Sequence, residues 1–269
     1  MIARLQPAPG DVVTREMLDG APPAMRRYLT WTGVVGRPIP GSMALRQTGR
    51  IRPDNDKPWW RFSAEESFLM GLPAFRWLAH VRMAGLPLLR VSDSYIAGRG
   101  RTQVRLARVL TVADHRGSEI NEAALLRYLS EMVWFPAAFL LGNVDRRQIG
   151  RNAAHVTIRD AGLSVTGTFR FDDVGRPLGF TALRSRDLGG NRFHADPWIA
   201  AFTAYGELNG VRVPIEGWSG YRLPSGILRY IELRVEPDLS PREQCRTPLP
   251  SSRTSGKAEP EARRTGGPR

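Results

Sequence analysis

The sequence contains few of the residues that bind metals or form disulfides. Its one cysteine, Cys245, lies in a polar segment near the C-terminus, which excludes a disulfide framework and a cysteine-based metal site. The four histidines stand far apart, and none has the spacing of a metal-ligand motif such as HExxH: His80, His115, His155 and His194. We therefore expect no bound metal, no cofactor and no thiol nucleophile.

Two common catalytic motifs and any long apolar run are also absent. There is no GxSxG elbow and no GxxxxGKS/T phosphate loop. The N-terminus lacks the apolar core of a signal peptide, and the uninterrupted apolar run from Met132 to Leu141 has ten residues, against the roughly 18 of a membrane span. We expect a soluble, cytoplasmic protein, for which peripheral membrane contact remains open.

Lysine is scarce but arginine is abundant. Lys57 and Lys257 are the only lysines among 39 basic residues, and the formal net charge is +13. Such an excess favours anionic partners such as phospholipid or nucleic acid. The segment from Ser240 to the end holds seven basic and three acidic residues, and the remaining positive charge is scattered along the body of the chain. This scatter argues against nucleic acid as a partner.

Short alternating segments dominate the sequence from about residue 42 onward. In Leu163–Phe171, for example, the apolar side chains stand at every second position, as a half-buried strand requires. We count about nine or ten such segments, separated by glycine, proline, asparagine or aspartate. So many twisted strands tend to curl. The sequence therefore predicts a mainly β (α+β) fold, with a large curved antiparallel sheet or half-barrel.

Three segments have the composition of turns between strands. "FDDVGRP" (171–177) and "YRLPSGILRY" (221–230) each place glycine between alternating runs, which indicates hairpins. "GRGR" (98–101) lacks the context of a phosphate-binding loop, so a hairpin turn with flanking arginines is the better interpretation.

Two helices are predicted to cover the concave face of this sheet. "PPAMRRYLTW" (22–31) predicts a short N-terminal helix, and a main helix should begin with Asn121 as N-cap and end before Pro136. We thus expect an N-terminal extension over 1–41, a curved β domain over 42–239 with a lid helix at 122–135, and a disordered tail over 240–269.

The main helix carries a charged pair within an apolar segment. Arg127 and Glu131 are four residues apart and share a helix face. The pair is either an exposed surface ion pair or a partly buried pair at the mouth of a cavity, where the loss of one partner costs far more.

Aromatic residues are concentrated in the predicted strands and on the main helix. They fit core packing, and together they also fit an apolar pocket with a few polar groups. Our candidate ligand-binding residues are Trp60, Phe62, Phe75, Trp77, Tyr95, Leu129, Val133, Trp134 and Trp218. Polar residues near these strands that could line the same pocket are Glu66, Asp93, Tyr95, Arg99 and Arg184.

Several phrases resemble, as a set, a bacterial family of unknown function: "MRRYL", "WWRFSAEESF", "PAFRWLAHVRM", "VSDSYIAGRGR", "LLRYLSEMVWFPAAFL" and "GTFRFDDVGRPLGFTALR". The resemblance spans roughly Met25 to Val235. More distantly the pattern is similar to the LolA/LolB type of lipoprotein and lipid carriers. That similarity implies a half-barrel whose concave face is covered by helices and binds an apolar ligand, and it implies no catalytic residue.

Three functions are compatible with these observations. We favour a non-catalytic protein that binds a lipid-like or other apolar small molecule under the helix. The first alternative is a cofactor-independent enzyme that uses the same pocket, with Glu131 as general acid or base and Arg127 or Arg184 holding an anion. The second alternative is a protein that binds an anionic surface or nucleic acid. The sequence does not determine the oligomeric state.

Overall fold

A computed structural model describes residues 7–83, 85–107, 109–189 and 192–237. The predicted tail over 240–269, with Cys245, lies outside these residues. Thirteen antiparallel strands form one sheet: β1 (Ser42–Ile51), β2 (Trp60–Leu69), β3 (Ala74–Met83), β4 (Leu86–Ile96), β5 (Arg99–Leu106), β6 (Leu110–His115), β7 (Val144–Gln148), β8 (Ala153–Asp160), β9 (Leu163–Phe171), β10 (Pro177–Asp187), β11 (Phe193–Leu208), β12 (Val211–Leu223) and β13 (Gly226–Pro237).

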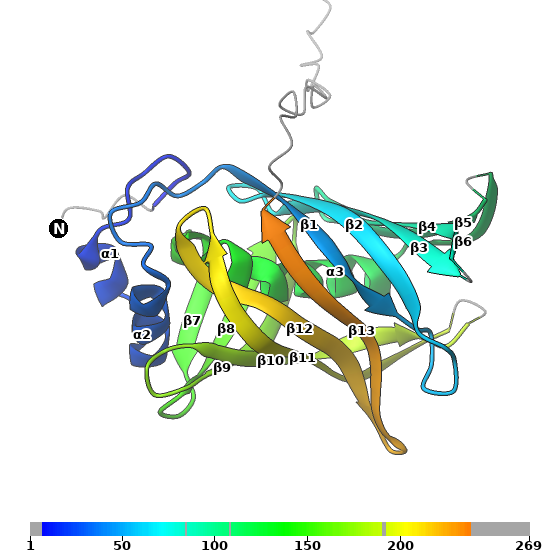
Figure 1. The fold of residues 1–269 in the computed structure, drawn as a ribbon. Helices are drawn as coiled ribbons and strands as arrows, with labels where there is room; N and C mark the ends of the chain where they lie inside the picture. The colour runs from blue at the N-terminus through cyan, green and yellow to red at the C-terminus, as the bar shows by residue number, and fades with distance from the viewer. Residues whose placement is uncertain (1–6, 84, 108, 190–191, 238–269) are drawn as a thin grey trace, which may run out of the picture. The chain divides into compact units, whose positions relative to one another are not determined.

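The sheet curls into a half-barrel, which confirms the predicted fold class. Its strand order is β6-β5-β4-β3-β2-β1-β13-β12-β11-β10-β9-β8-β7, so β6 and β7 are the edges. The connection between these edges carries helix α3 (Ser118–Glu131) and two 3₁₀ turns, η1 (Met132–Trp134) and η2 (Pro136–Leu140). Figure 1 shows α3 inside the curve of the sheet, where it packs against β4 and β5 on one side and β9 and β10 on the other.

The two halves of the sheet also touch each other directly. Tyr95 Oη on β4 donates a hydrogen bond of 2.7 Å to Asp160 Oδ2 on β8. Next to this bond, a Cβ placed on Gly98 would lie only 2.6 Å from Ala161 Cβ, so the β4–β5 and β8–β9 turns are in close contact. These contacts close the sheet around α3.

The buried side chains form one core between the sheet and the helices. In β9 the predicted alternation is confirmed, because every second residue from Val165 to Phe171 is buried and the residues between them are exposed or half-buried. The short N-terminal helix is confirmed as α2 (Pro23–Thr32), which follows α1 (Arg15–Asp19). Tyr28 of α2 is fully buried and stacks on Phe171 with ring centroids 5.2 Å apart.

All three predicted turns are confirmed. "FDDVGRP" joins β9 to β10, and Asp172 Oδ1 accepts hydrogen bonds from the amides of Val174 and Arg176. Gly175 adopts a φ of +95°, and a side chain there would overlap the backbone of Arg27, so this glycine allows α2 to approach the turn. The other two turns join β12 to β13 and β4 to β5.

The predicted start of the main helix was wrong. Helix α3 begins at Ser118, with Gly117 as its N-cap. Asn121 lies within the first turn, and its Oδ1 accepts a hydrogen bond of 2.7 Å from the Gly100 amide on β5. The asparagine therefore attaches the helix to the sheet instead of capping it. Toward the C-terminal end the helix changes to 3₁₀ geometry at Met132, before Pro136.

Candidate ligand-binding cavity

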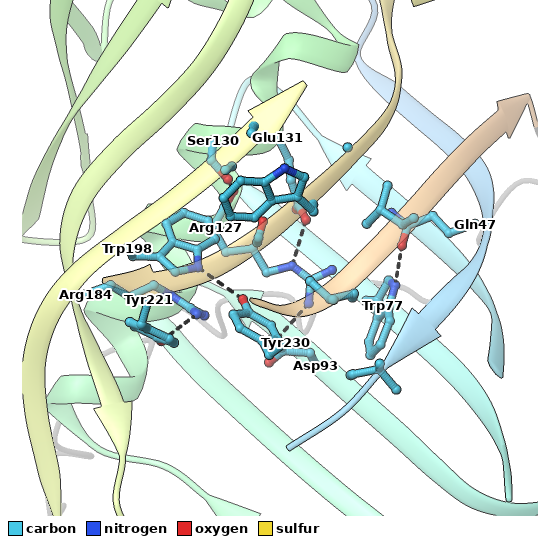
Figure 2. Close-up of a pocket in the computed structure, with 18 of the residues that line it drawn as sticks. Gln47, Trp77, Asp93, Arg127, Ser130, Glu131, Arg184, Trp198, Tyr221 and Tyr230 are labelled. Atoms are coloured by element: carbon cyan, nitrogen blue, oxygen red, sulfur yellow. Dashed lines mark hydrogen bonds and ion pairs between the residues drawn. The ribbon is translucent and has the colours of Figure 1, made fainter. Parts of the chain in front are cut away.

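A cavity of about 560 Å³, partly open to solvent, lies between the concave face of the sheet and the segment formed by α3 and η1. Figure 2 shows aromatic and polar side chains meeting in it. Its aromatic wall consists of Trp77, Trp134, Trp198, Phe202, Trp218, Tyr221 and Tyr230. Its polar lining includes Gln47, Asp93, Thr102, Arg127, Ser130, Glu131 and Arg184. The cavity thus combines a large apolar surface with a small number of convergent polar groups.

Arg127 occupies the centre of the polar lining. Its Nη2 donates to Glu66 Oε1 at 2.7 Å, its Nη1 to Asp93 Oδ2 at 2.8 Å and its Nε to Glu131 Oε1 at 2.8 Å. Each nitrogen of the guanidinium therefore serves a different carboxyl group, from β2, β4 and α3 respectively. The side chain of Arg127 is only 15% exposed, and that of Glu66 is fully buried. We call these four residues the Arg127 cluster.

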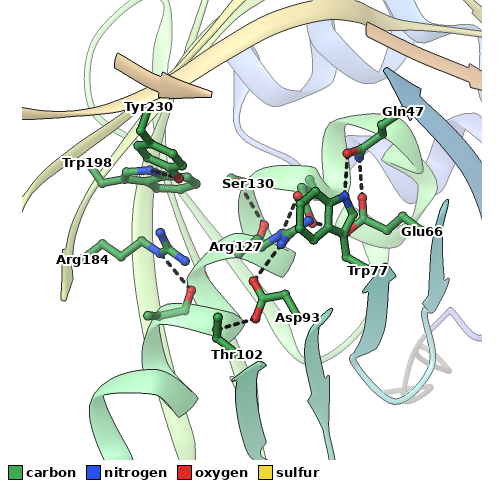
Figure 3. Close-up of polar contacts among 12 residues, drawn as sticks. Gln47, Glu66, Trp77, Asp93, Thr102, Arg127, Ser130, Arg184, Trp198 and Tyr230 are labelled. Atoms are coloured by element: carbon green, nitrogen blue, oxygen red, sulfur yellow. Dashed lines mark hydrogen bonds and ion pairs between the residues drawn. The ribbon is translucent and has the colours of Figure 1, made fainter. Parts of the chain in front are cut away.

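Neighbouring side chains hold the Arg127 cluster in place (Figure 3). Gln47 donates its amide to Glu66 Oε2 and accepts a hydrogen bond of 2.8 Å from Trp77 Nε1. Thr102 Oγ1 donates to Asp93 Oδ1 at 2.8 Å. The guanidinium carbon of Arg127 also lies 4.9 Å from the centre of the Trp77 ring. Because these partners belong to β1, β3 and β5, the cluster joins several strands to α3.

Burial and neighbouring charges shift the pKa values of the two glutamates of this cluster. Burial, reinforced by the neighbouring Glu131, raises the pKa of Glu66 well above its ordinary value. Burial also raises the pKa of Glu131, although Arg127 opposes this. The proximity of Glu131 and Asp93 to Glu66 adds to this effect, because like charges disfavour ionisation. Glu131 Oε2 is buried and has no hydrogen-bond partner among the described residues, which also favours a protonated carboxyl group.

Arg127 itself stays charged. Its burial alone would disfavour the cation, but Glu131, Glu66 and Asp93 outweigh this effect and raise its pKa well above the ordinary value. The interpretation of Arg127 and Glu131 as an exposed surface pair was therefore wrong, and the buried alternative describes the structure. Arg127 is also fully engaged, so it is a poor candidate for holding the anion of a reaction.

The structure divides the predicted ligand-binding residues into two groups. Trp77, Val133, Trp134 and Trp218 line the cavity, as do Arg127, Glu131 and Arg184. The other predicted residues do not line it: Trp60, Phe62, Phe75, Tyr95 and Leu129. Tyr95 and Leu129 are completely buried in the core, and Arg99 is exposed at the β4–β5 turn.

The sequence analysis missed four aromatic residues of the cavity wall, one of which is Phe202 on β11. Trp198 lies on β11, Tyr221 on β12 and Tyr230 on β13, and Trp198 Nε1 donates to Tyr230 Oη at 3.1 Å. Both tyrosines fall within the phrase read as a hairpin, where their positions before and after the turn could have placed them on neighbouring strands. Glu66, Asp93 and Arg127 were all named as candidates, but the ion pairs of Arg127 with Glu66 and Asp93 were not predicted.

Within the described ranges, no helix is both long and apolar enough to cross a membrane. No group of three or more histidine, cysteine, aspartate or glutamate side chains in these ranges is arranged to hold a metal ion. The three carboxyl groups of the Arg127 cluster are bonded to the guanidinium of Arg127.

Fold and cavity together define the chain as a half-barrel protein with a partly open, aromatic-walled cavity under a crossing helix. The chain belongs to the Family of unknown function (DUF6544), whose model matches residues 11–233. This match confirms the resemblance to a family of unknown function.

Solved structures with remote similarity include two crystal structures. One is a LolA superfamily protein from Nitrosomonas europaea, with 10% identity, 84% of this chain and 92% of that chain covered, and a TM-score of 0.41. The other is a DUF1329 family protein from Desulfovibrio piger, with 14% identity and a TM-score of 0.39. The match covers 84% of this chain and 93% of that chain. A search of the curated proteins found no match. Similarity at these TM-scores is too remote to assign a function to this chain.

Proposed function

We propose that this protein binds a lipid-like or other apolar small molecule in the cavity between α3 and the sheet. The supporting observation is the cavity itself, whose volume of about 560 Å³ lies within the range of small-molecule sites. An interior filled completely by side chains would leave no room for such a ligand.

The apolar lining is sufficient to bind a hydrocarbon chain. Burial of one methylene group contributes about 0.8 kcal/mol, so a chain of roughly ten could gain several kcal/mol after the costs of association. The tryptophan and tyrosine rings add rigid contact surface with little loss of conformational entropy. This estimate favours a molecule with one extended or ring-shaped apolar part.

Two measurements test the proposal. Mass spectrometry of an organic-solvent extract of the purified protein should reveal a co-purifying apolar molecule. The neutral fluorescent probe N-phenyl-1-naphthylamine should bind and receive excitation energy from the cavity tryptophans. Ala200→Leu, which reduces the cavity at its wall on β11, should weaken probe binding, whereas Ala195→Leu, exposed on the same strand, should not. Equal probe binding by both variants would contradict the proposal.

A second candidate function is supported by the Glu66–Glu131 pair. A carboxyl group with a raised pKa at the wall of an apolar cavity has the properties of a general acid or base. In this case Glu131 would transfer the proton, and Arg184 would hold the anion, because Arg127 is engaged. Hydrolysis of 4-nitrophenyl decanoate by the protein, abolished in Glu131→Gln, would support an enzyme; equal rates in both would exclude this reaction.

Binding to an anionic surface receives weaker support. Many exposed arginines are paired with carboxylates, including Arg50 with Glu232, Arg101 with Asp114 and Arg234 with Glu216. These pairs reduce the charge available to phosphates. Peripheral membrane contact is kept as a proposal, which co-sedimentation with phosphatidylglycerol vesicles at low and high salt would test.

A further inference from the structure

Arg184 differs from the other arginines of the cavity. Arg127 binds three carboxyl groups, and Arg186 pairs with Asp196 at 2.8 Å. Arg184 has no carboxylate within ion-pair distance among the described residues. It is nevertheless a half-buried side chain at the cavity wall, on β10. A cation removed from water without a counter-ion is unfavourable unless other groups, or a ligand, compensate.

The surroundings of Arg184 fix the position of its guanidinium. Nε donates to the carbonyl oxygen of Ala123 on α3 at 3.1 Å, and Nη1 donates to Tyr221 Oη at 3.1 Å. The guanidinium carbon lies 4.9 Å from the centre of the Trp198 ring. These contacts join α3, β10, β11 and β12 but leave Nη2 without a hydrogen-bond acceptor in the described part of the chain. The guanidinium is therefore held in place with donor capacity remaining at the cavity wall.

Among the described residues, no acidic side chain of the cavity accepts a hydrogen bond from Nη2 of Arg184. Asp93 and Glu131 also line the cavity and would repel an anion, but both are bonded to Arg127. A planar guanidinium matches a carboxylate better than any other common anion-binding side chain does, because it offers parallel N–H donors. The aromatic wall begins at Trp198 and Tyr221, directly beside this donor.

We propose that the cavity accepts an amphipathic carboxylate, with the carboxylate at Arg184 and the apolar chain along the wall formed by Trp198, Tyr221 and Tyr230. This inference rests on the proposed function and specifies the chemical class of its ligand. It assigns Arg184 as the residue that selects the head group, whereas Arg127 organises the polar lining.

Three ten-carbon probes with different head groups separate the alternatives: decanoate, 1-decanol and decylamine. Each competes with N-phenyl-1-naphthylamine at pH 8, where the acid is ionised and the amine is protonated. Decanoate should bind roughly tenfold or more tightly than 1-decanol, because charge-assisted hydrogen bonds are stronger than neutral ones. Arg184→Gln should abolish this preference, because it should weaken the binding of decanoate much more than that of 1-decanol. Arg61→Gln removes one positive charge from an exposed position on β2 and should change neither.

Arg184→Lys protects the test against a folding defect, because it keeps the charge and should retain part of the preference for decanoate. Stronger binding of decylamine than of decanoate would overturn the inference, as would an equal loss of all three probes in Arg184→Gln. If N-phenyl-1-naphthylamine binds but no head group is preferred, the inference fails and the proposed function stands. If the wild-type protein binds none of these molecules, the proposed function fails as well.

Discussion

At the level of single residues, Arg127 has the strongest predicted effect on stability, because its guanidinium compensates three buried carboxyl groups at once. Removal of one partner from a buried ion pair costs about 3–5 kcal/mol. Arg127→Gln should therefore lower the free energy of unfolding by about this amount, as measured by urea denaturation. Arg101→Gln disrupts a more exposed pair with Asp114 and should cost much less, because solvent screens exposed ion pairs. A similar small loss in both variants would contradict the compensating role of Arg127.

The raised pKa values of Glu66 and Glu131 predict a pH dependence of stability. Above the ordinary value of 4.5, the folded state retains protons on these groups that the unfolded chain releases. The contribution of these two groups to stability should therefore be fully present below this pH and should be lost as the pH rises through the raised values.

Glu131→Gln tests this dependence with little change of shape. The glutamine removes the ionisable group at position 131 and keeps nearly the same size. The variant should lose less stability than the wild type between about pH 5 and pH 8 in thermal unfolding experiments. Glu122→Gln, which makes the same charge change on the exposed face of α3, should retain the wild-type pH dependence. An unchanged pH profile in Glu131→Gln would contradict a raised pKa of Glu131 in the folded protein.

Residue-level prediction from the sequence was only partly successful for physical reasons. The i,i+4 spacing of Arg127 and Glu131 identified the pair, since it is local to one helix. Glu66 and Asp93 lie 61 and 34 residues from Arg127, on strands that approach only when the sheet curls. Nothing in their local sequence indicates a common partner. Burial of the pair likewise depends on α3 lying inside the sheet.

At the level of secondary-structure elements, Gly100 determines how closely α3 packs on the sheet. A Cβ at this position would lie 2.4 Å from the carbonyl oxygen of Ile120 and 3.0 Å from Ala124 Cβ. Gly100→Ala should push the helix away from β5 and destabilise the protein by about 1–3 kcal/mol. Gly20→Ala is the matched control, because its φ of −77° suits alanine and no atom lies within 4 Å. Equal stabilities of these variants would show that the contact is easily relieved.

The strands that the sequence predicted are those with clear alternation, such as β9. The predicted count of about nine or ten segments falls short of the thirteen strands, and strands with weak alternation include β4, β6, β7 and β12. β4 is polar over "SDS" because its inward residues include Asp93 of the Arg127 cluster, and β7 is a short charged edge strand. β12 contains Pro214 and two glycines that lie against neighbouring backbone, which interrupts the apolar pattern. Functional and edge positions therefore interrupt the alternating apolar pattern by which these strands would be recognised.

At the level of the whole domain, Tyr95 links the two halves of the sheet through its hydrogen bond to Asp160. Tyr95→Phe should cost about 1 kcal/mol or somewhat more, because Asp160 loses its donor. Hydrogen exchange should increase in β4, β5, β8 and β9 together, since the contact joins both halves. Tyr205→Phe removes a bond to the Pro177 carbonyl within one half, and its effect should stay local. A local response to Tyr95→Phe would contradict a linking role.

The strand order has a further consequence for the synthesis of this protein. The middle of the sheet is formed by β1 and β13, and Leu45 pairs with Pro237 although almost the entire domain separates them along the chain. On the ribosome, β1 can pair with β2 early, but its other side has no partner until the last strand has left the exit tunnel. The nascent chain therefore carries an open strand edge through nearly all of translation, and a ribosome that stalls before β13 leaves a product with that edge available for aggregation.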